Sequence, residues 1–404
     1  MNSPKPARTA LFVLALCFAL SVLGRGLSES FTVFLLPISQ TFGWDRAQIL
    51  SIYSAAALIG GLSAPIIGRL FDHSGPRVVF ALGLALLAGA FFVASFAQHL
   101  WQFQISLGLC AGIGAACIGN VPNSILLGRW FGARLSTAMA LIYSAMGAGV
   151  LLVLPLSQVL IDRFGWRSAY EIFGIAILIV LIPLLMLPWK RWAAGSAAVS
   201  RPVTTDLLNE GWTVLSAIRH HAFWALFSTF FFTAIGMYAI SAQIVAYLVD
   251  VGFSPLQAAT AWGFSGVVML AGMLSVTWLD GVIGRRRSVL FSYAISILGI
   301  VLLRMLRIYP NLILLGGFVI CFGSMLGSRG PLITATAMKI FRGKRVGTIY
   351  GTISIGSGLG AALGSWSGGL IHDLTGGYDA LLLFALVSVI LGMIPFLTIK
   401  ALRE

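Results

Sequence analysis

Hydrophobic and polar positions along this chain alternate on the scale of whole segments. A bilayer core about 30 Å thick is crossed by about 20 apolar residues in helical form. Apolar segments of that length recur through the sequence, and short polar stretches separate them. They predict twelve transmembrane helices, at 10–38, 47–70, 77–98, 101–128, 134–161, 168–188, 221–249, 255–279, 288–307, 311–338, 345–371 and 378–400.

The first apolar segment has to be distinguished from a signal peptide. It follows the polar start MNSPKPARTA and continues to residue 38, which is longer than the apolar core of a signal peptide. No small-residue cleavage site follows a short apolar core. We therefore expect it to be the first transmembrane helix.

Composition places the whole chain in a membrane. Of its 404 residues 59% are hydrophobic and 9% are charged, and its mean hydropathy is +0.97. A soluble domain has about 25% charged residues. The net charge of +14 would suggest nucleic acid as a partner of a soluble protein, but here the basic residues lie in short loops between apolar segments. The lipid bilayer is the expected partner, and nucleic acid is not.

The basic residues also predict the orientation, because cytoplasmic loops are enriched in Lys and Arg. With both termini in the cytoplasm, most basic residues fall on the inner side. The outer side keeps Arg46, Arg163, Arg167, Arg304 and Arg307. We expect a multi-pass protein of the cell (inner) membrane that functions as a monomer.

The longest hydrophilic stretch lies halfway along the chain. It predicts an N-terminal six-helix bundle at 1–188, a cytoplasmic linker at 189–220 and a C-terminal six-helix bundle at 221–404. Within the linker, 207–218 has the pattern of a short amphipathic helix on the inner surface.

The two halves resemble each other at an offset of 209 residues. Gly75 then falls on Gly284, and Pro122 falls on Pro331. Glycine matches alone carry modest weight in so glycine-rich a chain, but the same offset superimposes the predicted helices throughout. The expected fold is an all-α membrane protein with two pseudo-symmetric bundles.

Two loops at equivalent places carry charged turns. The first reads GRLFDHSGPR at 68–77, and the second reads LDGVIGRRR at 279–287. The first resembles the G-x-L-x-D-x-x-G-x-R loop of the major facilitator superfamily, in which substrates bind near mid-membrane between two halves. The resemblance implies gating loops, although a plain charged turn is the alternative. The residues concerned are Gly68, Asp72, Gly75, Arg77, Asp280, Gly284 and Arg286.

Three further stretches resemble the bacterial monocarboxylate transporter-like (anion:cation symporter) branch. They are FGWDRAQI at 42–49, GRWFGARLSTAMALIYSAMGAG at 128–149 and DRFGWRSAY at 162–170. Members of that branch often hold the substrate carboxylate with a basic residue in helix eight. Here 255–279 has no charge, and helix eleven lacks the lysine of some oxalate carriers. A cation that binds an anion must therefore lie elsewhere.

Arg25 and Glu29 lie inside the first predicted helix. Their spacing of four residues puts them on one face, where they can pair. Intramembrane charges are functional candidates because of their cost. We interpret Glu29 as a proton-coupling residue and Arg25 as a substrate contact. A self-neutralising pair that fixes helix packing is the alternative.

Arg329 lies in predicted helix ten, within GSRGPL, and has no acidic neighbour on that helix. Asn120, in GNVPN, is its repeat equivalent. Glycine and proline around both predict irregular helix, which is tolerated where it lines a cavity. A guanidinium suits carboxylate capture, so Arg329 is the predicted anion site and Asn120 a further substrate contact. The alternative gives Arg329 a carbonyl or carboxylate partner on another helix.

Polar residues in the seventh helix complete the candidates. Tyr238, equivalent to Glu29, and Gln243 are predicted substrate contacts, although interhelical hydrogen bonds are the commoner role. Asp162 and Asp373, at the outer ends of helices five and eleven, are expected turn or gate residues.

The cysteines add no chemistry to the prediction. Cys17, Cys110, Cys117 and Cys321 all lie inside predicted helices and form no metal-type pair. No metal and no cofactor are expected.

The charged and polar residues inside the predicted helices predict a secondary transporter of a small organic anion with protons as the coupling ion. An exporter or a siderophore or drug carrier of the same fold, working by proton antiport, is the alternative. A membrane-embedded enzyme or receptor is remote, because we find no nucleophile–base pair, metal cluster or sizeable soluble domain.

Overall fold

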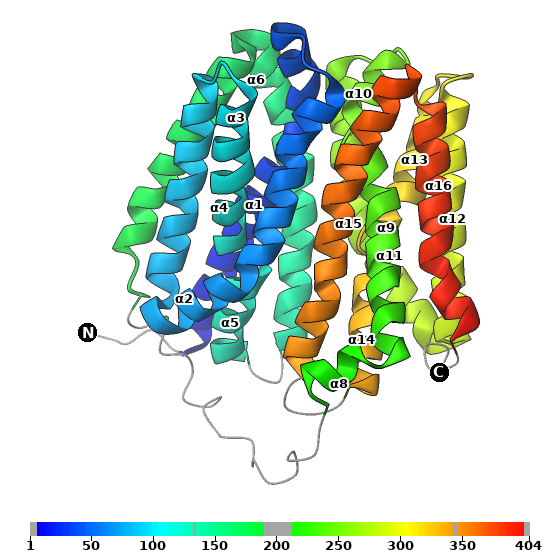
Figure 1. The fold of residues 1–404 in the computed structure, drawn as a ribbon. Helices are drawn as coiled ribbons and strands as arrows, with labels where there is room; N and C mark the ends of the chain where they lie inside the picture. The colour runs from blue at the N-terminus through cyan, green and yellow to red at the C-terminus, as the bar shows by residue number, and fades with distance from the viewer. Residues whose placement is uncertain (1–5, 132–134, 190–191, 193–211, 342–345, 400–404) are drawn as a thin grey trace. The chain divides into compact units, whose positions relative to one another are not determined.

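The computed structural model describes residues 6–131, 135–189, 192, 212–341 and 346–399. These residues form helices and short connections, with no strand among them (Figure 1). Contacts divide the chain into two units. Unit 1 comprises Met1–Phe34 and Ala55–Val203, and unit 2 comprises Leu35–Ser54 and Thr204–Glu404. Segment 35–54 thus belongs to unit 2, although the chain on both sides of it belongs to unit 1.

Three long helices dominate the first part of the chain. They are α1 (Pro6–Phe42), α2 (Arg46–Ser95) and α6 (Leu135–Met186). A straight helix of 50 residues would be about 75 Å long, more than twice the bilayer core. Gly75 in α2 and Gly165 in α6 interrupt the helices with φ of 78° and 80°, angles that favour glycine. Each interruption lies between two predicted spans.

The fourth predicted span is broken into shorter helices. In order they are α3 (Leu100–Phe103), η1 (Gln104–Cys110), α4 (Ala111–Cys117) and α5 (Asn120–Phe131). The chain leaves helical geometry at residues 118–119, immediately before Asn120.

Unit 2 contains the remaining helices. They are α8 (Val214–Ile218), α9 (His221–Ser241), α10 (Ile244–Asp250), α11 (Pro255–Ile283), α12 (Arg285–Leu306), α13 (Leu312–Phe318), η4 (Val319–Gly323), α14 (Gly330–Ile340), α15 (Val346–Thr375) and α16 (Asp379–Thr398). Most of the predicted linker 189–220 lies outside the described residues. Its described end holds α8, which Thr213 caps.

Helices in each unit approach closely through glycine. In unit 1, a Cβ on Gly149 of α6 would overlap the Val22 carbonyl oxygen of α1. In unit 2, a Cβ on Gly364 of α15 would overlap the Ile235 carbonyl oxygen of α9. Small residues at such crossings are typical of packing in membranes, where close contact has to replace the hydrophobic effect.

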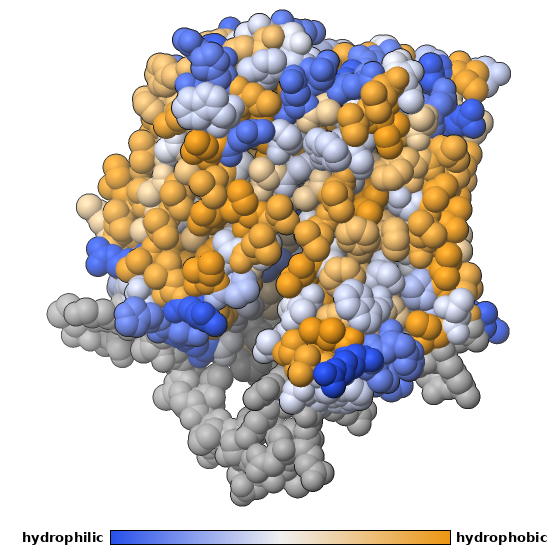
Figure 2. Space-filling view, in the orientation of Figure 1, coloured by the Kyte–Doolittle hydropathy of each residue, from blue (hydrophilic) through white to orange (hydrophobic). Residues whose placement is uncertain are grey.

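The exposed surface fits a bilayer. Within the described residues, eight helices are long and apolar enough to cross a membrane. Figure 2 shows hydrophobic side chains over the middle of the helices and polar ones toward their ends. The chain is a multi-pass membrane protein, and the count of twelve spans stays a prediction.

Candidate functional site

The charged pair of α1 is an ion pair. Arg25 Nη2 lies 2.7 Å from Glu29 Oε1 within one helix face. The two side chains differ in exposure, at 32% for Arg25 and 7% for Glu29. A carboxylate so deep in an apolar helix costs several kcal/mol unless it is offset, and Arg25 offsets it. The arginine itself reaches accessible space.

Backbone packing holds this turn of α1 in place. A Cβ on Gly26 would lie 2.6 Å from the Gly149 carbonyl oxygen of α6, so the two helices touch beside the pair. The hydroxyls of Ser28 and Ser30 donate hydrogen bonds to backbone carbonyls of α1 itself. The pair therefore lies on a turn of α1 that is packed tightly against α6.

Arg329 is buried inside unit 2, and its contacts are with α12. Its Nε donates to Ser292 Oγ at 3.0 Å, and its Nη2 donates to the Ser292 carbonyl at 2.7 Å and to Ser296 Oγ at 2.5 Å. The carbonyl partner that was the alternative prediction is therefore present. Nη1 has no hydrogen-bond partner within the described residues.

An aromatic ring covers the same guanidinium. The Arg329 Cζ lies 4.0 Å from the ring centroid of Tyr293 on α12, a cation–π contact. The Tyr293 hydroxyl donates to the Gly392 carbonyl of α16 at 2.9 Å and lies 2.7 Å from the Thr233 hydroxyl of α9. Contacts with α12, and through Tyr293 with α9 and α16, thus fix the position of Arg329.

The backbone around both repeat-equivalent positions is irregular, as predicted. Gly327, with φ of 73°, lies in the turns that precede Arg329 and the start of α14. Asn120 begins α5 after the break at 118–119 and is exposed. The sequence missed Asn123, which is buried and donates to Ser21 Oγ at 2.9 Å. Its only signal was a second asparagine in GNVPN.

The predicted contacts in the seventh helix lie near its break between α9 and α10. Tyr238 is half-buried, and its ring centroid lies 6.4 Å from that of Tyr53. Gln243 is 1% exposed, and neither atom of its amide group has a partner among the described residues. The Ser241 hydroxyl is also buried and has no hydrogen-bond partner among the described residues. Buried polar groups without partners cost free energy, so this break offers unused donors and acceptors.

The two predicted gating loops turn at equivalent glycines. Gly75 and Gly284 have φ of 78° and 82°, the region that glycine favours. Arg285 Nε lies 3.7 Å from Asp280 Oδ1. The remaining predicted loop residues are placed as follows: Asp72, Arg77 and Arg286 are exposed, and Gly68 is half-buried in α2.

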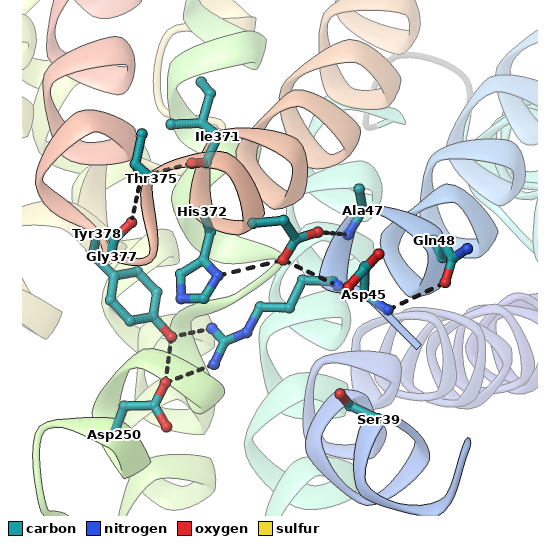
Figure 3. A network of polar contacts seen from close by, with 12 residues as sticks. Ser39, Asp45, Ala47, Gln48, Asp250, Ile371, His372, Thr375, Gly377 and Tyr378 are labelled. Carbon is teal, nitrogen blue, oxygen red and sulfur yellow. Dashed lines mark hydrogen bonds and ion pairs between the residues drawn. The ribbon is translucent and has the colours of Figure 1, made fainter. Parts of the chain in front are cut away.

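Unit 2 contains a polar cluster that was not predicted from the sequence (Figure 3). It joins Arg46 of α2 to Asp250 of α10, Asp373 of α15 and Tyr378, which precedes α16. Only Asp373 was expected at a gate. We call these four residues the Arg46 cluster.

The predicted site residues fall in separate units. Arg25, Glu29 and Asn120 belong to unit 1, and Arg329, Tyr238 and Gln243 belong to unit 2. The structure brings Arg25 to Glu29 and gives Arg329 uncharged partners.

Comparison with known proteins identifies the class. The family model of the Major Facilitator Superfamily matches residues 14–365, so the chain belongs to that superfamily. The uncharacterized MFS-type transporter YcxA of Bacillus subtilis (strain 168) is 27% identical over 98% of each chain. Monocarboxylate transporter 12 of Mus musculus is 25% identical over 98% of this chain and 87% of its own length. Monocarboxylate transporter 13 of Bos taurus is 26% identical over 91% of this chain and 84% of its own length.

These relatives confirm the resemblance drawn from the loop motifs. The protein is a membrane transporter for a small molecule and not an enzyme.

Proposed function

We propose that this protein carries a small organic anion of the monocarboxylate type together with a proton, by alternating access. The observation that carries the proposal is the Arg25–Glu29 pair, an accessible guanidinium beside a nearly buried carboxylate. The names of the relatives support a carboxylate as the substrate class. We further propose that the protein works as a monomer in the inner membrane with both termini in the cytoplasm.

Coupling follows from the charge of the pair. While Glu29 is ionised it neutralises Arg25 and competes with an incoming anion. A proton on Glu29 removes that competition, and Arg25 becomes available for a substrate carboxylate. Binding of proton and anion together leaves the net charge of the carrier unchanged. The loaded carrier and the empty carrier can then both reorient, since the charge of Arg25 is compensated in each of them.

Arg329 is the second cation in the proposal. Its contacts with Ser292, Ser296 and the Tyr293 ring fix the guanidinium plane, and its Nη1 remains without a partner. A buried donor left unpaired costs about 1–3 kcal/mol, which a carboxylate oxygen would relieve. Preorganisation of this kind reduces the entropy lost on binding. Asn120, Tyr238 and Gln243 are proposed as polar contacts, and the loops at 68–77 and 279–287 as inner gates.

Purified protein in liposomes tests this function. Carboxylates are first screened by thermal shift, and those that raise the melting temperature are then tested for uptake under an inward proton gradient. We expect a monocarboxylate to accumulate, and Arg25→Gln to lose both the shift and the uptake. Uptake that is insensitive to the proton gradient would contradict symport. A lack of response to any carboxylate, with uptake of a cationic or neutral solute, would contradict the substrate class.

A further inference from the structure

The Arg46 cluster is built from four side chains of different elements. Arg46 Nη2 lies 2.7 Å from Asp250 Oδ2, and the Tyr378 hydroxyl donates to the same oxygen at 2.7 Å. Arg46 Nη1 also donates to the Tyr378 hydroxyl. A cation–π contact adds to these bonds, since the Arg46 Cζ lies 5.2 Å from the Tyr378 ring centroid. Figure 3 shows Asp250 and Tyr378 joined by a dashed line.

Asp373 binds the same segment through its backbone. Its Oδ1 accepts from the Arg46 N–H at 3.2 Å, and its Oδ2 accepts from the Ala47 N–H at 2.7 Å. These N–H groups belong to the first turn of α2, which has no intrahelical acceptors for them. A carboxylate from α15, distant in sequence, therefore caps α2, and its charge suits the positive end of the helix dipole.

Small residues extend the contact along α15. The hydroxyl oxygens of Ser54 and Ser365 are 2.7 Å apart. A Cβ on Gly369 would lie 2.9 Å from the Ala47 Cα. Two kinds of contact thereby hold segment 35–54 on the rest of unit 2: the polar Arg46 cluster and the close packing of small residues against α15.

The cluster differs from a core ion pair in its access to water. The Arg46 side chain is 13% exposed and that of Asp250 is 38% exposed. Water can replace either partner when they separate, so the desolvation cost of a broken pair is limited. The contact between the segment and α15 is also made by small residues, so no large side chain has to leave a pocket when the two surfaces separate. The contact has the character of a reversible attachment.

We propose that the Arg46 cluster is a gating attachment, with Arg46, Asp250, Asp373 and Tyr378 holding segment 35–54 on unit 2 in one state of the transport cycle and releasing it in the other. This rests on the alternating access of the proposed function, and not on the substrate's being an anion. Segment 35–54 contains the end of α1 and the start of α2, and the rest of both helices belongs to unit 1. Movement of these helices as rigid rods with unit 1 therefore separates the segment from the rest of unit 2. The predicted orientation places this end outside the cell.

A labelling experiment tests the attachment without any substrate. Ser365→Cys places a thiol at a fully buried position against Ser54. Its reaction with a water-soluble maleimide is followed in the full-length purified protein by mass spectrometry of the peptide that contains it. We expect slow labelling in the parent and labelling about tenfold faster with Arg46→Gln or Asp250→Asn, the factor expected for loss of a charge-assisted hydrogen bond.

Two further variants separate gating from misfolding. Arg46→Glu combined with Asp250→Arg restores opposite charges and should return labelling toward the parent rate. Arg307→Gln is the matched control, because Arg307 pairs with Asp379 at 2.6 Å, outside segment 35–54. It should leave labelling unchanged. Equal acceleration by Arg307→Gln, or no acceleration by either cluster variant, would overturn the proposal.

A cross-link gives the opposite test. Ser54→Cys with Ser365→Cys places two thiols where hydroxyls now lie 2.7 Å apart, close to disulfide geometry. Oxidation should stop uptake and reduction should restore it, while the thermal shift by substrate survives. Full uptake in the oxidised protein would contradict the attachment. Loss of the substrate shift in the unmodified parent would instead count against the proposed function.

Discussion

Arg329 and Tyr293 form a stacked pair inside unit 2, with the guanidinium carbon 4.0 Å from the ring centroid. The other partners of Arg329 within the described residues are two hydroxyls and one carbonyl. All of these are formally neutral. A buried charge is strongly disfavoured without an opposite one, and in the proposed function the substrate carboxylate supplies that opposite charge.

Replacement of Arg329 by lysine should abolish anion binding. Arg329 makes three hydrogen bonds to Ser292 and Ser296 and keeps Nη1 in addition. Lysine has three donors in all, so it cannot keep these three contacts and also offer a donor to a carboxylate. We expect Arg329→Lys and Arg329→Ala to lose the carboxylate thermal shift and the uptake. A folded Arg329→Lys protein that keeps wild-type uptake would show that the guanidinium is only structural.

Tyr293→Phe separates stability from binding at the same place. The variant keeps the ring under Arg329 but removes the hydroxyl from Gly392 and Thr233. Loss of these two hydrogen bonds should lower the free energy of unfolding by about 1–3 kcal/mol, measured by thermal or denaturant unfolding. Carboxylate affinity should change little. A large loss of affinity would mean that the hydroxyl itself contacts the substrate.

Glu29→Gln should uncouple transport from pH. The amide keeps the shape of the side chain but cannot take up a proton, and it removes the Glu29 charge that pairs with Arg25. In liposomes we expect exchange of labelled for unlabelled anion to persist, while accumulation driven by a proton gradient is lost. Glu171→Gln, at another glutamate of unit 1, is the matched control and should accumulate normally. Normal accumulation by Glu29→Gln would refute the proton role.

The features that the sequence predicted are local ones. The apolar segments predicted the helices, because hydropathy over a span needs no tertiary information. The Arg25–Glu29 pair was predictable because its members are four residues apart on one helix. The irregular backbone near Asn120 and Arg329 followed from glycine and proline at those positions.

The features that the sequence did not predict depend on distant contacts. Arg46 and Asp250 are separated by 204 residues, and Arg46 and Asp373 by 327. No periodicity links them, so their meeting required the fold. Arg329 was predicted with or without a partner, and its contacts with Ser292 and Ser296 depended on the fold, which places residue 329 beside α12. Serines at those places look like any polar residue of a membrane helix.

Gly364→Ala should destabilise unit 2. The added Cβ would overlap the Ile235 carbonyl oxygen of α9, and a backbone atom cannot move aside as a side chain can. Overpacking of this kind costs about 1–3 kcal/mol, and we expect a lower melting temperature in detergent. Gly358→Ala in the same helix is the control, since a Cβ there would meet nothing within 4 Å. Equal effects from both variants would indicate a general intolerance of α15 and not a tight crossing.

Acidification should loosen the Arg46 cluster through His372, which follows the predicted span 345–371. Burial and the Arg46 charge lower the pKa of His372 below its usual 6.5, while the neighbouring Asp373 and Asp250 oppose that shift. Its ring also faces Tyr378, at 4.6 Å between centroids. A lowered pKa means that the attached state binds the proton more weakly than the released state.

The attached state is therefore fully favoured above the ordinary pKa and loses stability as the pH falls below it. We expect maleimide labelling of Ser365→Cys to accelerate between about pH 7.5 and about pH 5.5, after correction for the intrinsic pH dependence of the thiol reaction. His372→Gln should flatten that response while leaving labelling slow at high pH, because the contacts of Arg46 with Asp250 and Tyr378 remain. Faster labelling at high pH than at low pH would reverse the sign and contradict a role for His372 in release.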